Sequence, residues 1–192
     1  MKSLSRWLLK AMGWKLVGEQ PALDKYVLIF APHTSNWDVI LLLLVRWASG
    51  LKPNFIGKHT LFWPPLSWFL TAIGGEPVNR TKAKNVVDQI VEKFHSKDEF
   101  KFALSPEGTR SKKDHWKTGF YRVALKAQVP IQLVFLDTRT KQTGFGPLLH
   151  PSGNIEKDFE WLRAFYQDKQ GFRPHLLSEI RVNIAKEKNK SQ

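Results

Sequence analysis

Residues 26–45 read YVLIFAPHTSNWDVILLLLV, and this stretch decides the fold. It opens with an uncharged apolar run of the length of a buried strand and closes with an apolar run typical of a buried helix. We therefore predict a strand over 25–31 and a helix over 37–49. The turn between them carries two residues of catalytic type, His33 and Asp38.

The same alternation of strand-like and helix-like runs continues along the chain. Such an order favours an α/β domain with a mostly parallel central sheet and helices on its faces. We predict a single domain of this kind, with an amphipathic helix at the N-terminus. Further strands are expected at 54–57, 76–79, 100–104 and 129–137, and further helices at 62–73, 83–97, 120–128 and 154–167.

His33 is expected directly after the first strand, with Asp38 about one helical turn further on. This spacing lets a carboxylate accept a hydrogen bond from one imidazole nitrogen while the other nitrogen faces a substrate. The alternative is an ordinary loop histidine beside a first-turn acid that stabilises the helix dipole. The spacing alone does not decide between the two.

A second polar cluster, residues 105–111, follows the predicted strand at 100–104. It contains Gly108, which lets the backbone approach a ligand closely, and Arg110, whose planar guanidinium suits a phosphate. A Pro-Glu-Gly turn with a solvated arginine is the alternative interpretation.

Two further cations, Lys58 and Arg80, follow short strand candidates. Either one alone is explained as a surface cation at a strand end. In open α/β sheets, however, ligands bind outside the carboxyl ends of the strands. The four strand ends together therefore predict a single site that collects His33, Arg110 and these two cations.

In these segments the sequence resembles the glycerolphosphate and lysophosphatidic acid acyltransferases. The resemblance spans roughly residues 25–137 and keeps the order of the family's four motifs. The motif at 106–111 is highly specific, whereas the second and fourth are weak alone. The four motifs correspond to residues 33–38, 75–80, 106–111 and 129–131.

The resemblance implies transfer of a fatty acyl group from acyl-CoA or acyl carrier protein to a hydroxyl of a lysophospholipid, foremost 1-acylglycerol 3-phosphate, which gives phosphatidic acid. His33 would be the general base, and Asp38 would hold the imidazole in the correct tautomer. Glu107 would complete the catalytic set by orienting the arginine and its loop. The residues implied in substrate binding are Lys58, Arg80, Gly108, Thr109 and Arg110.

A thioester is already activated, so its reaction with a hydroxyl mainly needs a base, a positioned acceptor and a stabilised oxyanion. The chain has no cysteine and no Gly-x-Ser-x-Gly sequence, so the usual nucleophiles lack a recognisable setting. We expect direct attack by the acceptor, with the acyl donor as co-substrate and with no cofactor or metal ion. A lysolipid with another head group, such as an amino acid, is the alternative acceptor.

Thirty Lys and Arg residues against 17 Asp and Glu give a net charge of +13. Such a charge attracts a polyanion: nucleic acid, anionic lipid or an acidic carrier protein. A nucleic-acid-binding protein is the alternative from another functional class, but the sequence has no zinc-finger spacing, RNP-like motif or helix-turn-helix signal. We expect an anionic membrane surface, the lysophospholipid and the acyl donor as partners, and no nucleic acid. The basic segment 110–126 is either a docking surface for carrier protein or coenzyme A, or a solvated face.

The N-terminal residues predict an amphipathic helix with tryptophan beside basic residues, as in helices that lie in a membrane interface. No run reaches the roughly 18 apolar residues of a transmembrane helix. We expect a peripheral, monotopic protein on the cytoplasmic face of a membrane; the alternative is a helix that caps the domain core. Its apolar face would comprise Leu4, Trp7, Leu8, Ala11, Met12 and Trp14.

The sequence thus predicts a membrane-surface helix over 1–20, an acyltransferase domain over 21–180 and a basic tail over 181–192. A second aromatic stretch, residues 61–70, is broken by two prolines. It is expected to line an acyl-chain groove, dip into lipid or pack in the core.

Overall fold

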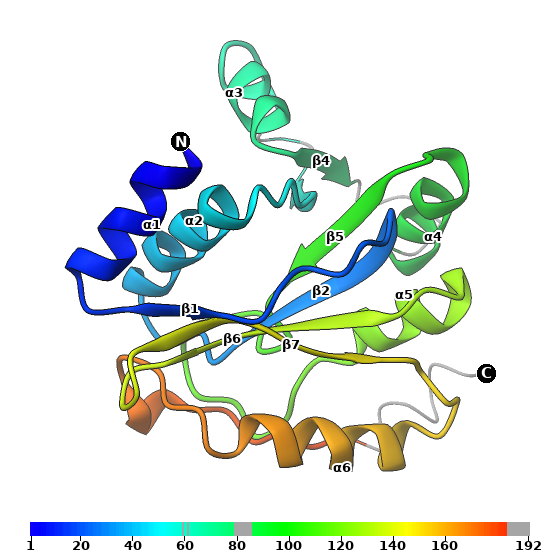
Figure 1. Cartoon of the computed structure of the whole chain (residues 1–192). Coiled ribbons are helices and arrows are strands. Elements are labelled where there is room, and N and C mark those ends of the chain that lie inside the picture. Colours follow the sequence, from blue (N-terminus) through cyan, green and yellow to red (C-terminus); the bar gives the residue numbers. More distant parts are fainter. Residues whose placement is uncertain (59, 61, 79–85, 184–192) are drawn as a thin grey trace.

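The computed structural model describes residues 1–58, 60, 62–78 and 86–183, and Figure 1 shows a central sheet with helices on both faces. Three of the four strand pairings in this sheet are parallel, and only β6 and β7 pair antiparallel. The prediction of a mostly parallel central sheet is confirmed. In spatial order the five strands are β1 (Lys15–Val17), β7 (Gln142–Leu149), β6 (Ile131–Asp137), β2 (Lys25–Ala31) and β5 (Phe100–Leu104).

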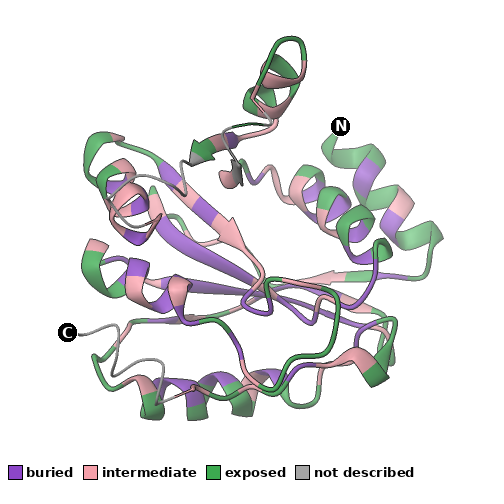
Figure 2. Ribbon diagram, turned by 180° about the vertical axis from the view of Figure 1, so that it is seen from behind, coloured by how far each residue is buried: buried purple, intermediate pink, exposed green. Residues whose placement is uncertain are grey.

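Strand β2 lies between two hydrophobic cores, which explains why its sequence is apolar almost throughout. Because side chains alternate along a strand, Val27 and Ile29 enter one core, while Tyr26 and Leu28 enter the other. Figure 2 shows the central strands as mostly buried. The first core is covered by α4 (Val86–Ser96), α5 (Gly119–Ala127) and α6 (Ile155–Tyr166), and the opposite face by α1 (Lys2–Ala11) and α2 (Trp37–Ser49).

The boundaries expected for β2, α2 and β5 are confirmed residue by residue. The next two strands were expected in the central sheet, and this prediction is wrong. Strands β3 (Phe55–Lys58) and β4 (Gly75–Val78) form a separate two-stranded sheet. Pro77 within β4 has no backbone N–H to donate to a ladder, which limits the strand to an edge position. Main-chain hydrogen bonds of Asn54 to β5, both 2.7 Å, hold the small sheet against the large one.

The short helix α3 (Leu66–Ala72) projects away from the rest of the molecule (Figure 1). None of its residues is buried, so the interpretation of this aromatic stretch as core packing is wrong for the helix. Trp63, Trp68 and Phe69 are all more than half exposed, at 57%, 73% and 62%.

The N-terminal boundary is a second correction. The first helix ends at Ala11, and residues 15–17 form strand β1 of the main sheet, so the domain begins before residue 21. Strand β1 pairs with β7 where Gly144 has φ +145°; a Cβ there would lie 1.9 Å from the carbonyl oxygen of Val17. The close approach of the two strands therefore requires a glycine.

The C-terminal boundary also differs from the prediction. Residues 181–183 belong to the domain, because Val182 packs against the core and the amide of Trp116 donates to the carbonyl of Arg181 at 3.2 Å. The rest of the expected basic tail, residues 184–192, lies outside the described residues.

One side of helix α1 covers the domain core, and another side remains exposed, as expected of a membrane-surface helix. Leu9, which was not among the residues predicted for the apolar face, is only 1% exposed and packs with Leu41 and Leu44 of α2. Leu4 and Trp7 remain 60% and 63% exposed. The helix thus covers part of the core and still presents apolar side chains outward.

Candidate active site

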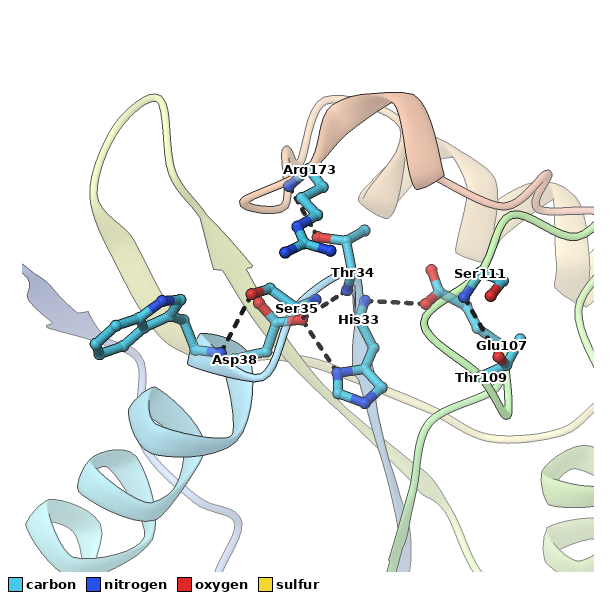
Figure 3. Close-up of polar contacts among 9 residues, drawn as sticks. His33, Thr34, Ser35, Asp38, Glu107, Thr109, Ser111 and Arg173 are labelled. Atoms are coloured by element: carbon cyan, nitrogen blue, oxygen red, sulfur yellow. Dashed lines mark hydrogen bonds and ion pairs between the residues drawn. The ribbon is translucent and has the colours of Figure 1, made fainter.

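The turn between β2 and α2 is organised around the carboxylate of Asp38. Its Oδ2 atom lies 3.1 Å from Nδ1 of His33 and accepts hydrogen bonds from the amides of Thr34 at 2.6 Å and Ser35 at 2.8 Å (Figure 3). Asp38 is fully buried, so these donors replace the water that an exposed carboxylate would bind. The predicted pairing of the two side chains is therefore present.

The contact with Asp38 orients the imidazole of His33. With Nδ1 as donor to the carboxylate, the second ring nitrogen is left as an acceptor, and it points away from Asp38 (Figure 3). The side chain is 15% exposed and lines a cleft. The ring of Phe30 packs edge-on against it, with 5.0 Å between centroids. This is the arrangement required of a general base.

Glu107 contributes to this turn from the loop that follows β5, the neighbouring strand. Its Oε2 atom accepts a hydrogen bond from the main-chain amide of His33 at 3.0 Å (Figure 3). We expected Glu107 to orient the arginine and its loop; the loop that it holds is the one that carries the histidine. Burial raises its pKa to about 8, against the lowering effect of the His33 amide and with a further rise from the charge of Asp38.

The turn after Glu107 brings the remaining motif residues to the same cleft. Gly108 has φ +64°, which favours glycine, and its amide donates to the carbonyl of Ser105 at 3.1 Å. The hydroxyl of Thr109 accepts from the amide of Ser111 at 3.3 Å. Arg110 is exposed at the cleft. The structure thus brings together His33, Gly108, Thr109 and Arg110, as the sequence predicted.

The cleft measures about 840 Å³ and has a polar and an apolar part. His33 lies in the polar part with the Gly108 turn, Arg110 and Lys117. The apolar part lies between β3, β5, α4 and α5 and is lined by Phe55, Ile56, Val86, Val87, Ile90, Phe102 and Val123. An amphiphilic substrate with an anionic head group and a hydrocarbon chain matches this division.

The side chains of two predicted site residues, Lys58 and Arg80, are not described by the structure. The main chain of Lys58 ends β3, whose Phe55 and Ile56 line the cleft, but its side chain is not described. Arg80 lies outside the described residues. Their part in substrate binding stays a prediction. In the described chain, no group of three His, Asp or Glu side chains could hold a metal ion.

Sequence reasoning missed a segment after α6 that packs on the outside of the histidine turn. The Thr34 hydroxyl accepts from the amide of Arg173 at 3.1 Å (Figure 3). A Cβ on Gly171 would lie 2.4 Å from that hydroxyl. The hydroxyl of Thr138, just after β6, donates to the carbonyl of Gln170 at 3.1 Å and so ties the segment to the sheet. No local pattern reveals a contact between residues this far apart in sequence.

Comparison with known proteins agrees with this geometry. The family described as Acyltransferase matches residues 15–136. The 1-acyl-sn-glycerol-3-phosphate acyltransferase of Saccharomyces cerevisiae is 27% identical over 131 residues, which is 65% of this chain and 43% of the yeast protein. The chain therefore spans less than half the length of this curated relative.

The fold is also found in a solved structure. The crystal structure of the 1-acyl-sn-glycerophosphate (LPA) acyltransferase PlsC from Thermotoga maritima superposes with a TM-score of 0.57 at 18% identity, over 86% of this chain and 73% of that one. At this identity the likeness shows the fold alone. The family match, which takes in β1, the histidine turn and the Glu107 turn, shows that the chain belongs to the acyltransferase family.

Proposed function

We propose that this protein transfers a fatty acyl group from acyl-CoA or acyl carrier protein to the free hydroxyl of 1-acylglycerol 3-phosphate, giving phosphatidic acid. The observation that carries the proposal is the position of His33, which is paired with the buried Asp38, in the polar part of a cleft whose other part is apolar. The relatives from yeast and Thermotoga maritima are named for this reaction. A lysolipid with another head group is the alternative acceptor.

In the proposed reaction, the acceptor-facing nitrogen of His33 removes the proton from the acceptor hydroxyl. The hydroxyl oxygen attacks the thioester carbonyl, the carbon–sulfur bond breaks, and the leaving thiolate takes the proton back from the imidazolium. Asp38 stabilises the imidazolium because its buried carboxylate already accepts from His33 Nδ1. No acyl-enzyme is needed, and general-base help of this kind is typically worth about 10²–10⁴-fold.

Glu107 acts through the backbone of His33 in this mechanism. With its pKa raised to about 8, the side chain is mostly neutral at pH 7 and adds little negative charge beside the imidazole. Its carboxyl oxygen still holds the His33 amide at 3.0 Å. We therefore assign Glu107 a positioning role rather than a step in proton transfer.

The anionic end of the acceptor is proposed to bind at the Gly108 turn. Gly108 gives the turn its positive φ, and Arg110 provides a guanidinium at the cleft beside it. Lys58 and Arg80 are proposed to add charge to the same site. The acyl chain is proposed to occupy the apolar part between β3, β5, α4 and α5.

We propose a peripheral position on the cytoplasmic face of an anionic membrane. The outward sides of α1 and α2 expose large apolar side chains, including Trp7 at 63% and Trp47 at 38%. Arg46 of α2 donates to the carbonyl of Ile73 at 3.0 Å, which ties the exposed helix α3 to the same side. In the described residues no helix is long and apolar enough to cross a bilayer. Val39 of α2 is 45% exposed and also lines the cleft, so the apolar surface continues toward the site.

The central experiment measures acyl transfer from labelled acyl-CoA and acyl carrier protein to a panel of lysolipids. Transfer to 1-acylglycerol 3-phosphate is expected, and His33→Ala should lower kcat by roughly 10²–10⁴-fold because the general base is lost. His95→Ala, which changes an exposed histidine at the end of α4, is the matched control. Transfer that survives in His33→Ala would remove this residue from the base role, and transfer to phosphate-free acceptors alone would overturn the assigned substrate.

Glu107 predicts a dependence of stability on pH. Between about pH 5 and 8 the folded protein keeps a proton on Glu107 that the unfolded chain, with its ordinary pKa of 4.5, has lost. The free energy of unfolding should therefore fall as the pH rises, by up to about 1.4 kcal/mol per pH unit from this group. Glu107→Gln should lack this contribution. Urea denaturation should therefore show that the free energy of unfolding of the variant increases relative to that of the wild type as the pH rises.

The control for this experiment is Glu99→Gln, because the pKa of Glu99 is lowered by the hydrogen bond and charge of Lys101. Glu99 is therefore ionised in both the folded and the unfolded states above pH 5, and its removal should leave the pH dependence unchanged. Parallel curves for wild type and Glu107→Gln would contradict a neutral, buried Glu107.

The membrane proposal predicts that Trp7→Ala combined with Trp47→Ala weakens binding to vesicles that contain anionic lipid. We expect at least a roughly tenfold lower partition coefficient in a sedimentation assay, since two large apolar side chains lose their lipid contact. Trp161→Ala on α6 is the control, because Trp161 is 39% exposed, as Trp47 is at 38%, but lies on the opposite face of the sheet. Equal binding of all three proteins would refute a membrane contact through α1 and α2.

A further inference from the structure

Lys117 lies in the polar part of the cleft, but it belongs to none of the motifs that point to the site. Its main chain is firmly placed: the amide donates to the carbonyl of Pro106 at 2.8 Å, and its neighbours Trp116 and Thr118 are 1% and 4% exposed. Lys117 itself is exposed. The fold thus fixes the base of this side chain and leaves its ammonium group at the cleft.

The side chain of Lys117 lies across the Gly108 turn. A Cβ built on Gly108 would be 2.5 Å from Nζ of Lys117, 2.8 Å from Cε and 2.9 Å from Cδ. The aliphatic stem therefore occupies the space that any side chain at this position would need. Glycine at 108 serves two purposes: it adopts a positive φ and it lets the lysine reach across the turn.

The charge of Lys117 has no carboxylate partner among the described residues. In the part of the chain that the structure describes, no carboxylate lies within ion-pair distance of Lys117 or of Arg110. Both cations line the cleft together with Gly108 and His33. Helix α5 begins at Gly119, two residues after the lysine, and Gly119 also lines the cleft, so the positive end of this helix dipole adds to the field there.

We propose that Lys117 is a specificity-determining residue that binds the phosphate of the acceptor, together with Arg110, over the Gly108 turn. Arg110 offers a planar pair of donors to two phosphate oxygens, and the ammonium of Lys117 adds a point charge at the same turn. This deepens the proposed function, on which it rests, by adding a residue that favours a phosphate-bearing acceptor over a neutral one.

The two substrates both carry phosphate, so the source must be distinguished. Acyl-CoA has phosphates remote from the thioester, whereas the acceptor phosphate of 1-acylglycerol 3-phosphate is only a few bonds from the reacting hydroxyl. Lys117 and the base His33 line the same cleft, which favours the acceptor as the source. A role toward coenzyme A predicts a changed KM for the donor instead.

The test compares wild type with Lys117→Met, which keeps the aliphatic stem and removes the charge, and with Lys117→Arg, which restores it. Lys112→Met is the control, because Lys112 is an exposed lysine of the same loop that does not line the cleft. KM and kcat are measured for 1-acylglycerol 3-phosphate, for monoacylglycerol and for acyl-CoA. Binding of glycerol 3-phosphate is followed separately by ³¹P NMR titration.

We expect Lys117→Met to raise KM for 1-acylglycerol 3-phosphate roughly 10- to 100-fold, the effect of losing one hydrogen bond to a charged group. Its kcat, its KM for acyl-CoA and its rate with monoacylglycerol should stay within about threefold of wild type, and Lys117→Arg should recover most of the affinity. An unchanged KM for the phosphate acceptor, or an effect confined to acyl-CoA, would overturn the proposal.

The NMR titration separates this proposal from the proposed function. If the wild type transfers no acyl group to any acceptor, the reaction assignment fails, but binding of glycerol 3-phosphate still tests the site. Weaker binding by Lys117→Met than by Lys112→Met then supports a phosphate site at the Gly108 turn. Equal binding by the two variants, or none by the wild type, overturns it.

Discussion

The buried carboxylate of Asp38 is the constraint on which the site depends. One of its oxygens accepts from His33 and from two main-chain amides, and the residue has no exposed surface. A buried carboxylate without such donors is very costly, so the turn must take the one conformation that supplies them. The same hydrogen bonds that stabilise the charge therefore fix the orientation of the imidazole.

Elements far apart in the sequence support this turn from two sides. Glu107, in the turn after β5, holds the His33 amide, and the segment after α6 holds Thr34 through Arg173. The parallel pairing of β2 with β5 and β6 brings these elements to the same edge of the sheet. The fold contributes rigidity at the one point where the chemistry needs a fixed donor and acceptor geometry.

Local patterns predicted the parts of the structure that depend on local interactions. The strand, turn and helix around His33 and Asp38 were predicted with their boundaries, because the apolar runs have clear lengths and the pair is only five residues apart. Strand β7 was missed because Gly144, Gly146 and Pro147 lower its strand propensity, and only pairing with β6 makes it a strand. The Glu107–His33 hydrogen bond spans 74 residues, and no sequence pattern encodes such a contact.

The most direct test of this account is the activity of Asp38→Asn. An amide oxygen at this position can still accept from the main-chain donors and from His33 Nδ1, because one carboxylate oxygen serves all three. The amide has no negative charge to stabilise the imidazolium, so His33 becomes a much weaker base. The account predicts that the variant folds with a melting temperature near that of the wild type and loses kcat by roughly 10³–10⁴-fold. A folded Asp38→Asn protein that keeps its kcat within about threefold would contradict it.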